Sequence, residues 1–129
     1  MILLAAAACG PRTAPSTPAF EPSDRARLAA EVRSELARCW HAYEKYAWGH
    51  DELRPVSGRP RDWYAAPLLI TPVDALDSLL LTGLDGEAKR AQALIDEKLS
   101  FDRDFPVKNF EITIRVLGGL LSGYELTQD

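Results

Sequence analysis

The stretch Ser23–Trp48 reads SDRARLAAEVRSELARCWHAYEKYAW and predicts one long helix. Ser23 is a favourable N-cap, and Asp24 follows it in the first turn. Apolar and aromatic side chains then recur three or four residues apart, which is the spacing of one helix face: Leu28, Val32, Leu36, Trp40, Tyr43 and Ala47. Gly49 suits the left-handed conformation that commonly ends a helix. We therefore expect a helix over residues 24–48.

Two further helices are predicted after a long loop. Residues 50–70 contain several prolines and Gly58, so we expect a structured loop there. Thr71 and Pro72 then offer an N-cap and a first helical residue for a helix over residues 73–81, which Gly83 ends. Another apolar face predicts a helix over residues 87–99: Ala88, Ala91, Leu94, Ile95 and Leu99. The short turn between these two helices indicates a helical hairpin.

The last segment, residues 108–126, satisfies two patterns. Its first half alternates apolar and polar residues as a strand does: Phe110, Ile112, Ile114 and Val116. Its second half has helical spacing: Leu117, Leu120, Leu121 and Tyr124. Gly118 and Gly119 would each weaken a helix by about 1 kcal/mol relative to alanine, unless close packing compensates. The residue pattern alone leaves helix and strand open.

The composition indicates one small globular domain and excludes nucleic-acid binding. The chain has 129 residues, of which 47% are hydrophobic and 26% charged. Such a length suits one modest core. The formal net charge is -4, and the lysines and arginines form no basic run. An electrostatic footprint for DNA or RNA is therefore missing.

The N-terminus predicts export. Residues 1–10, MILLAAAACG, resemble the end of a bacterial lipoprotein signal, in which small residues precede an acylated cysteine, although no Lys or Arg precedes the apolar run. Residues 10–22 are rich in Pro, Ser, Thr and Ala and suit a tether. We expect a signal-like segment over residues 1–9, a linker over 10–22, a folded part over 23–129 and a lipid anchor at Cys9. Such a protein would be periplasmic or membrane-anchored in a bacterium. The alternative is an apolar terminus without function.

Three blocks together carry a family resemblance. They are YAWGHDEL at residues 46–53, VDALDSL at 73–79 and FEITIRVLGGLLSGY at 110–124. In this order and spacing they resemble glycoside hydrolase family 47, the class I α-1,2-mannosidases, and the resemblance covers residues 39–129. The segment 65–70, AAPLLI, and the lipoprotein-like start indicate a bacterial branch.

The resemblance implies an all-α fold, in which helical hairpins form part of an (αα)7 barrel and residues 108–126 are helical. It also implies Ca2+-dependent inverting hydrolysis of terminal α-1,2-linked mannose in mannose-rich oligosaccharides. Nothing in the sequence matches the family's catalytic base or its calcium-binding threonine. We therefore expect an N-terminal part of the barrel, inactive by itself, that self-associates through exposed apolar helix faces.

By resemblance, Glu111 is the general acid. It is flanked by Phe110 and Ile112, and an apolar setting favours the protonated form that an acid needs. The alternative is a polar residue of a first helical turn, stabilised by the helix dipole. Arg115 lies four residues on and by resemblance reaches into the sugar-binding pocket. Its alternative is a simple i,i+4 ion pair with Glu111.

Four other carboxylates are substrate-binding candidates by resemblance: Asp51, Glu52, Asp74 and Asp77. The alternatives are solvation in the loop for the first two and helix-dipole capping for the last two. Sugar rings commonly stack on aromatic faces, so Trp48, Trp63 and Tyr64 are candidate platforms, with a core position favoured for Trp48. No metal-ligand spacing accompanies His50, and we expect no protein ligand for Ca2+ in this chain.

Two other functions fit less of the sequence. A lipid-anchored helical module that binds glycan or a partner without catalysis agrees with the missing base. An unrelated helical-hairpin domain requires the three blocks to be coincidence.

Overall fold

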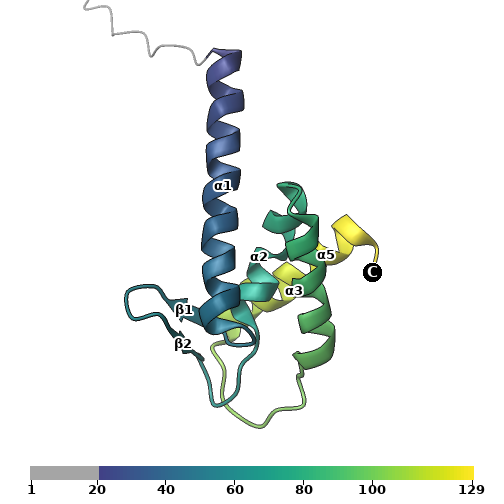
Figure 1. Ribbon diagram of the computed structural model, residues 1–129. Helices are drawn as coiled ribbons and strands as arrows, with labels where there is room; N and C mark the ends of the chain where they lie inside the picture. Colours follow the sequence, from purple (N-terminus) through teal and green to yellow (C-terminus); the bar gives the residue numbers. More distant parts are fainter. Residues whose placement is uncertain (1–20) are drawn as a thin grey trace, which may run out of the picture.

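The computed structural model describes residues 21–129 and is mainly helical (Figure 1). Its elements are α1 (Pro22–Ala47), β1 (Glu52–Arg54), β2 (Arg59–Arg61), α2 (Ile70–Leu81), α3 (Asp85–Lys98), α4 (Asn109–Glu111), the π-helix η1 (Ile112–Leu117) and α5 (Gly118–Thr127). The all-α prediction is confirmed, whereas the (αα)7 barrel to which these helices were expected to contribute stays a prediction. The signal-like residues 1–9 and Cys9 lie outside the described residues. Among the helices described, none has the length and apolarity to cross a membrane.

Helix α1 starts two residues earlier than predicted. Pro22 takes a first-turn position, which suits its fixed φ, and Ser23 lies inside the helix instead of capping it. Only the C-terminal half of the predicted face is buried, at Trp40, Tyr43 and Ala47, whereas Val32 is exposed. Figure 1 shows the reason, because the N-terminal half of α1 extends beyond the other helices.

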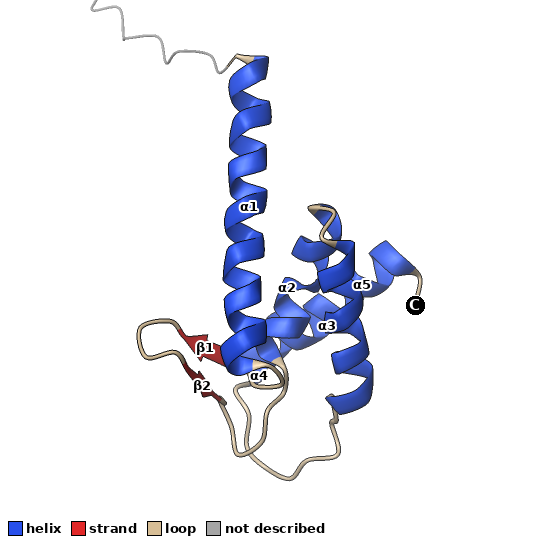
Figure 2. Ribbon diagram, in the orientation of Figure 1, coloured by secondary structure: helices blue, strands red, loops and turns tan. Residues whose placement is uncertain are grey.

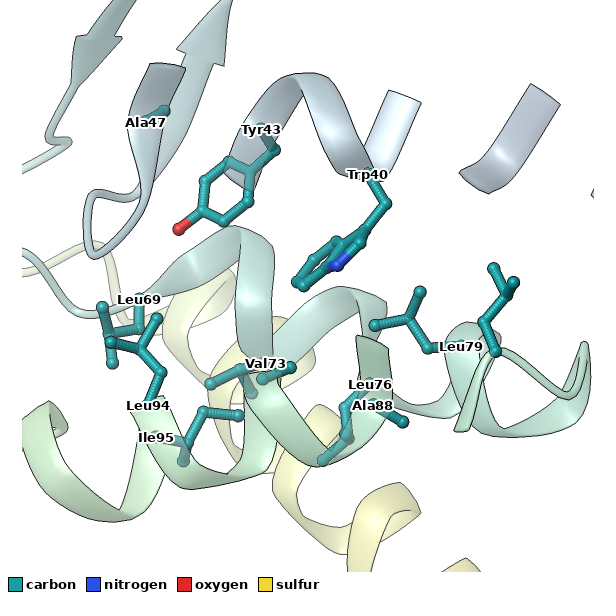
Figure 3. Close-up of a cluster of buried hydrophobic side chains, with 12 residues drawn as sticks. Trp40, Tyr43, Ala47, Leu69, Val73, Leu76, Leu79, Ala88, Leu94 and Ile95 are labelled. Carbon is teal, nitrogen blue, oxygen red and sulfur yellow. The ribbon is translucent and has the colours of Figure 1, made fainter. Parts of the chain in front are cut away.

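The core lies between the C-terminal half of α1 and the α2–α3 hairpin (Figure 3). It contains Trp40, Tyr43, Ala47, Leu69, Val73, Leu76, Leu79, Leu84, Ala88, Ala91, Leu94 and Ile95. The predicted hairpin is confirmed, with Gly83 at φ +68° in its turn. Both helices start earlier than predicted, α2 after Leu69 in a left-handed conformation and α3 at Asp85. Thr71 is therefore not an N-cap.

The loop over residues 50–70 contains a short antiparallel β-hairpin, drawn in red in Figure 2. Glu52 pairs with Arg61, Leu53 with Pro60, and Arg54 with Arg59. The structured loop predicted here is present, but the hairpin within it was not predicted. Three-residue strands are too short to produce a periodic sequence signal.

Residues 109–127 form one continuous helical segment, which confirms the helix over residues 108–126 that the resemblance implied and excludes the strand alternative for its first half. Its middle part, η1, has π-helical hydrogen bonding that no sequence pattern predicted. Short π-helical stretches within helices often occur at functional sites. Here the π-helix contains Arg115 and directly follows Glu111.

Gly119 brings α5 close to α2. A Cβ atom at Gly119 would lie 2.7 Å from the carbonyl oxygen of Val73, whereas one at Gly118 would lie 3.7 Å from its nearest neighbour, the carbonyl oxygen of Thr113. The packing that compensates for glycine in this helix is therefore present at Gly119 and not at Gly118.

These adjacent glycines give a matched test. Gly119→Ala is expected to lower the free energy of unfolding by about 2 kcal/mol, because the α2 backbone must move to admit the methyl group. Gly118→Ala is expected to raise it by up to about 1 kcal/mol, since alanine is the better helix former. Urea denaturation followed by circular dichroism measures both changes. Shifts of the same sign would contradict the packing argument.

Candidate functional site

Arg115 joins two of the predicted acidic residues. Its Nε donates a hydrogen bond of 2.8 Å to Oε2 of Glu111, and its Nη1 donates to Oδ2 of Asp74 on α2. The side chains are 38% (Arg115), 34% (Asp74) and 29% (Glu111) exposed, so solvent reaches all three. The hydrogen bond to Glu111 and then the contacts with Asp74 raise the pKa of the guanidinium. The predicted i,i+4 pair is present, and α2 adds a second carboxylate to it.

Trp63 and Glu52 extend this group toward the β-hairpin. The guanidinium of Arg115 lies over the indole ring of Trp63, 5.4 Å from its centroid. The indole Nε1 donates a hydrogen bond of 2.7 Å to Oε2 of Glu52, and Nη1 of Arg61 donates one of 2.9 Å to Oε1. Burial favours a higher pKa for Glu52, but these donors outweigh it and hold the pKa below its usual value. A continuous polar chain thus runs from Arg61 to Glu111.

Asp51 has a different position from the one that the resemblance suggested. It is fully buried, with 0% of its surface exposed. Its Oδ1 accepts hydrogen bonds from the amides of Leu68 (2.7 Å) and Ile70 (3.3 Å), and its Oδ2 accepts one from the amide of Trp63 (2.8 Å). As placed, this carboxylate cannot contact a sugar. It fixes the loop that carries Trp63 and leads into α2.

Asp77 also lies between protein groups. Its Oδ2 accepts a hydrogen bond of 2.9 Å from the hydroxyl of Ser122 on α5, and its Oδ1 accepts one of 3.2 Å from Ser78. The residue follows Asp74 by three positions and therefore shares its side of α2. Its contacts join α2 to α5, the helix that directly follows the Arg115-bearing η1.

The aromatic candidates are mostly engaged with the protein. One face of Trp63 lies under Arg115, and Tyr64 stacks on Phe105 with 5.9 Å between ring centroids. Trp48 is exposed and contacts Trp40 edge-on at 6.1 Å, so its favoured assignment to the core was wrong. Glu111 also lacks the enclosed apolar surroundings that were expected, because its neighbour Phe110 is 70% exposed.

The sequence did not reveal the role of Asp62. Its Oδ1 accepts a hydrogen bond of 3.0 Å from the amide of Asp51, and its carboxylate lies 3.1 Å from Nδ1 of His50. Asp62 directly follows β2, so its contacts with His50 and Asp51 could be foreseen only if the β-hairpin were known.

The residues around Glu111 do not fit a calcium site. Calcium takes six to eight oxygen ligands, mainly carboxylates, carbonyls and water. Between residues 21 and 129, no three His, Cys, Asp or Glu side chains gather as a metal-binding group. The carboxylates of Glu52, Asp74 and Glu111 instead accept hydrogen bonds from arginine or tryptophan. No chemical step in this segment is therefore assigned to a metal.

Comparison of the sequence with known protein families identifies the family of this chain. Residues 35–129 match the model of glycosyl hydrolase family 47. The chain belongs to this family. The family 47 match includes all six predicted site residues, and it excludes the interpretation as an unrelated helical hairpin.

The relatives carry mannosidase names. The chain is 43% identical over 108 residues to the endoplasmic reticulum mannosyl-oligosaccharide 1,2-alpha-mannosidase of Rattus norvegicus, covering 84% of the chain and 16% of the relative. It is 48% identical over 90 residues to the enzyme of the same name from Homo sapiens, covering 70% and 13%. It is 42% identical over 109 residues to mannosyl-oligosaccharide 1,2-alpha-mannosidase MNS1 of Arabidopsis thaliana, covering 84% and 19%. The chain thus spans less than a fifth of the length of these relatives. The bacterial branch stays a prediction of the sequence.

Proposed function

We propose that this chain supplies the general acid of an inverting α-1,2-mannosidase that acts on mannose-rich oligosaccharides. The observation that carries the proposal is the position of Glu111, which is partly exposed and held by Arg115 within a family 47 segment. Inverting hydrolysis uses one carboxylic acid to protonate the leaving oxygen and a second carboxylate to activate water on the opposite face of the sugar. Glu111 is proposed as the first of these.

The contacts of Glu111 suggest which oxygen carries the proton. Arg115 binds Oε2, and within residues 21–129 Oε1 receives no hydrogen bond. The catalytic proton would therefore reside on Oε1, which is free to meet the glycosidic oxygen. Asp74 shares the guanidinium, and its negative charge offsets part of the attraction that Arg115 exerts on an ionised Glu111. Arg115 can thereby orient Glu111 while attracting its ionised form less strongly than an arginine without a second carboxylate would.

A segment exchange tests the proposal. Residues 35–129 replace the matching segment of the rat relative, and mannose release from a mannose-rich oligosaccharide is measured with calcium and with a chelator. We expect release that the chelator abolishes, and no release by the 129-residue chain alone, since one carboxylate cannot complete the inverting reaction. A folded chimera without activity would overturn the proposal. Binding of the oligosaccharide by that inactive protein would instead favour the non-catalytic module.

We also propose that the exposed apolar stripe on α4, η1 and α5 drives self-association of the isolated chain. The stripe consists of Phe110, Ile114, Leu117, Leu121 and Tyr124, all exposed. Leu117→Glu combined with Leu121→Glu is expected to shift the sedimentation coefficient to that of a monomer, because each charge disfavours burial of the stripe. The control is Leu81→Glu, another exposed leucine, outside the stripe. A monomeric unaltered chain would contradict this prediction.

Export of the chain is part of the same proposal. The rat and human relatives are named as endoplasmic reticulum enzymes, which agrees with passage through a secretory route. Acylation at Cys9 rests on the sequence of residues 1–10 alone. Mass spectrometry of the N-terminal peptide from the native host would show whether a lipid is attached.

A further inference from the structure

The indole ring of Trp63, a candidate platform for a sugar, is covered on one face by Arg115. The guanidinium of Arg115 lies over it at 5.4 Å, within the range of a cation–π contact. Trp63 also packs against the buried apolar side chains of Leu68, Ile70 and Val116. The ring is therefore a platform for an arginine that also binds Glu111.

Glu52 fixes the orientation of this platform. An indole N–H is a single donor of fixed direction, and its 2.7 Å hydrogen bond to Oε2 of Glu52 restricts rotation of the ring. Arg61 in turn holds Oε1 of Glu52 across the strand pair, where the two residues are in register. The backbone of Trp63 is anchored separately by its amide, which donates to Asp51. Both ends of Trp63 are thus tied to the hairpin loop.

We infer that Trp63 and Glu52 are positioning residues, which hold Arg115 and through it the carboxyl group of Glu111. The catalytic meaning of this inference rests on the proposed function, whereas the contacts can be tested without it. Asp74 fixes one side of the guanidinium and Glu111 the other, so the indole face is what restricts movement out of that plane. A catalytic acid must be held within a fraction of an ångström of its productive position, which makes such support consequential.

The experiment is nuclear magnetic resonance of the full chain, reading the exchange of the Arg115 Hε proton with water. Trp63→Leu is expected to accelerate this exchange about threefold, the factor that corresponds to loss of an exposed cation–π contact. Glu52→Ala is expected to accelerate it less, because the indole ring remains but loses the hydrogen bond that orients it. Trp63→Phe is expected to accelerate it less than Trp63→Leu, because phenylalanine keeps an aromatic face. Glu52→Gln is expected to fall between Glu52→Ala and the unaltered chain, since its amide oxygen still accepts from the indole. Glu97→Ala is the control, since Glu97 also forms a surface ion pair but lies on α3.

A role limited to packing predicts the same response to phenylalanine and leucine at position 63, and that result would overturn the inference. Unchanged exchange in folded Trp63→Leu and Glu52→Ala would overturn it as well. If these variants fail to fold, the unaltered chain decides. A nuclear Overhauser effect between the indole ring and the Cδ protons of Arg115 supports the inference, and its absence refutes it. Failure of the proposed function is seen separately, as a folded but inactive segment-exchange chimera in which this spectroscopic signature persists.

Discussion

Replacing Glu111 by glutamine in the segment-exchange chimera is expected to lower kcat by about 100-fold or more, the contribution typical of general acid catalysis. Glutamine has nearly the same shape, and its amide oxygen can still accept the hydrogen bond that Arg115 donates to Oε2. It cannot deliver a proton to the glycosidic oxygen. KM is expected to change by less than about twofold, because the variant loses an interaction of the transition state and not of the ground state.

Substrates with different leaving groups distinguish the loss of acid catalysis from a general loss of activity. An aryl mannoside with a strongly acidic phenol needs little protonation as its glycosidic bond breaks, so Glu111→Gln should slow its hydrolysis far less than that of the oligosaccharide. Glu125→Gln is the matched control, since Glu125 is an exposed glutamate further along the same helical segment. Equal losses with both substrates would assign Glu111 to structure and remove it from the proposed mechanism.

The helices were predictable because their apolar residues repeat with a helical period over several turns. The sequence could not show that the N-terminal half of α1 lies beyond the core, because periodicity describes a face and not its partner. The β-hairpin and η1 were also beyond prediction. Each strand has three residues, and π-helical bonding changes the local hydrogen-bond pattern without a characteristic residue type.

The site was predictable where its residues are neighbours on one helix. Glu111 and Arg115 are four positions apart, and their contact follows from helical geometry. The contacts of Arg115 with Asp74 and Trp63 join distant parts of the chain, and no spacing rule reaches them. Asp51 and Glu52 show the same limit. As the chain enters β1, one side chain is buried against loop amides, whereas the other accepts donors from Trp63 and Arg61.

Asp51→Ala is expected to have the largest effect on stability, lowering the free energy of unfolding by about 4 kcal/mol. The substitution removes the acceptor of three amides, those of Trp63, Leu68 and Ile70, and the last two are buried. A buried donor left without a partner costs about 1–3 kcal/mol. Water entering the space would satisfy some of these amides, which keeps the estimate below the sum of three full penalties.

Asp51→Asn tests how much each of the two carboxylate oxygens contributes to the free energy of unfolding. With its carbonyl oxygen in place of Oδ1, the asparagine still accepts from the amides of Leu68 and Ile70, but its NH2 group then faces the amide donor of Trp63. We therefore expect Asp51→Asn to lose about half as much stability as Asp51→Ala, since only one of the three hydrogen bonds is replaced by a donor–donor contact. The control is Asp104→Ala, an exposed loop aspartate, which should change stability by less than about 0.5 kcal/mol. Urea denaturation followed by circular dichroism measures all three variants, and an Asp51→Ala midpoint equal to that of the control would show that the buried carboxylate does not hold the loop.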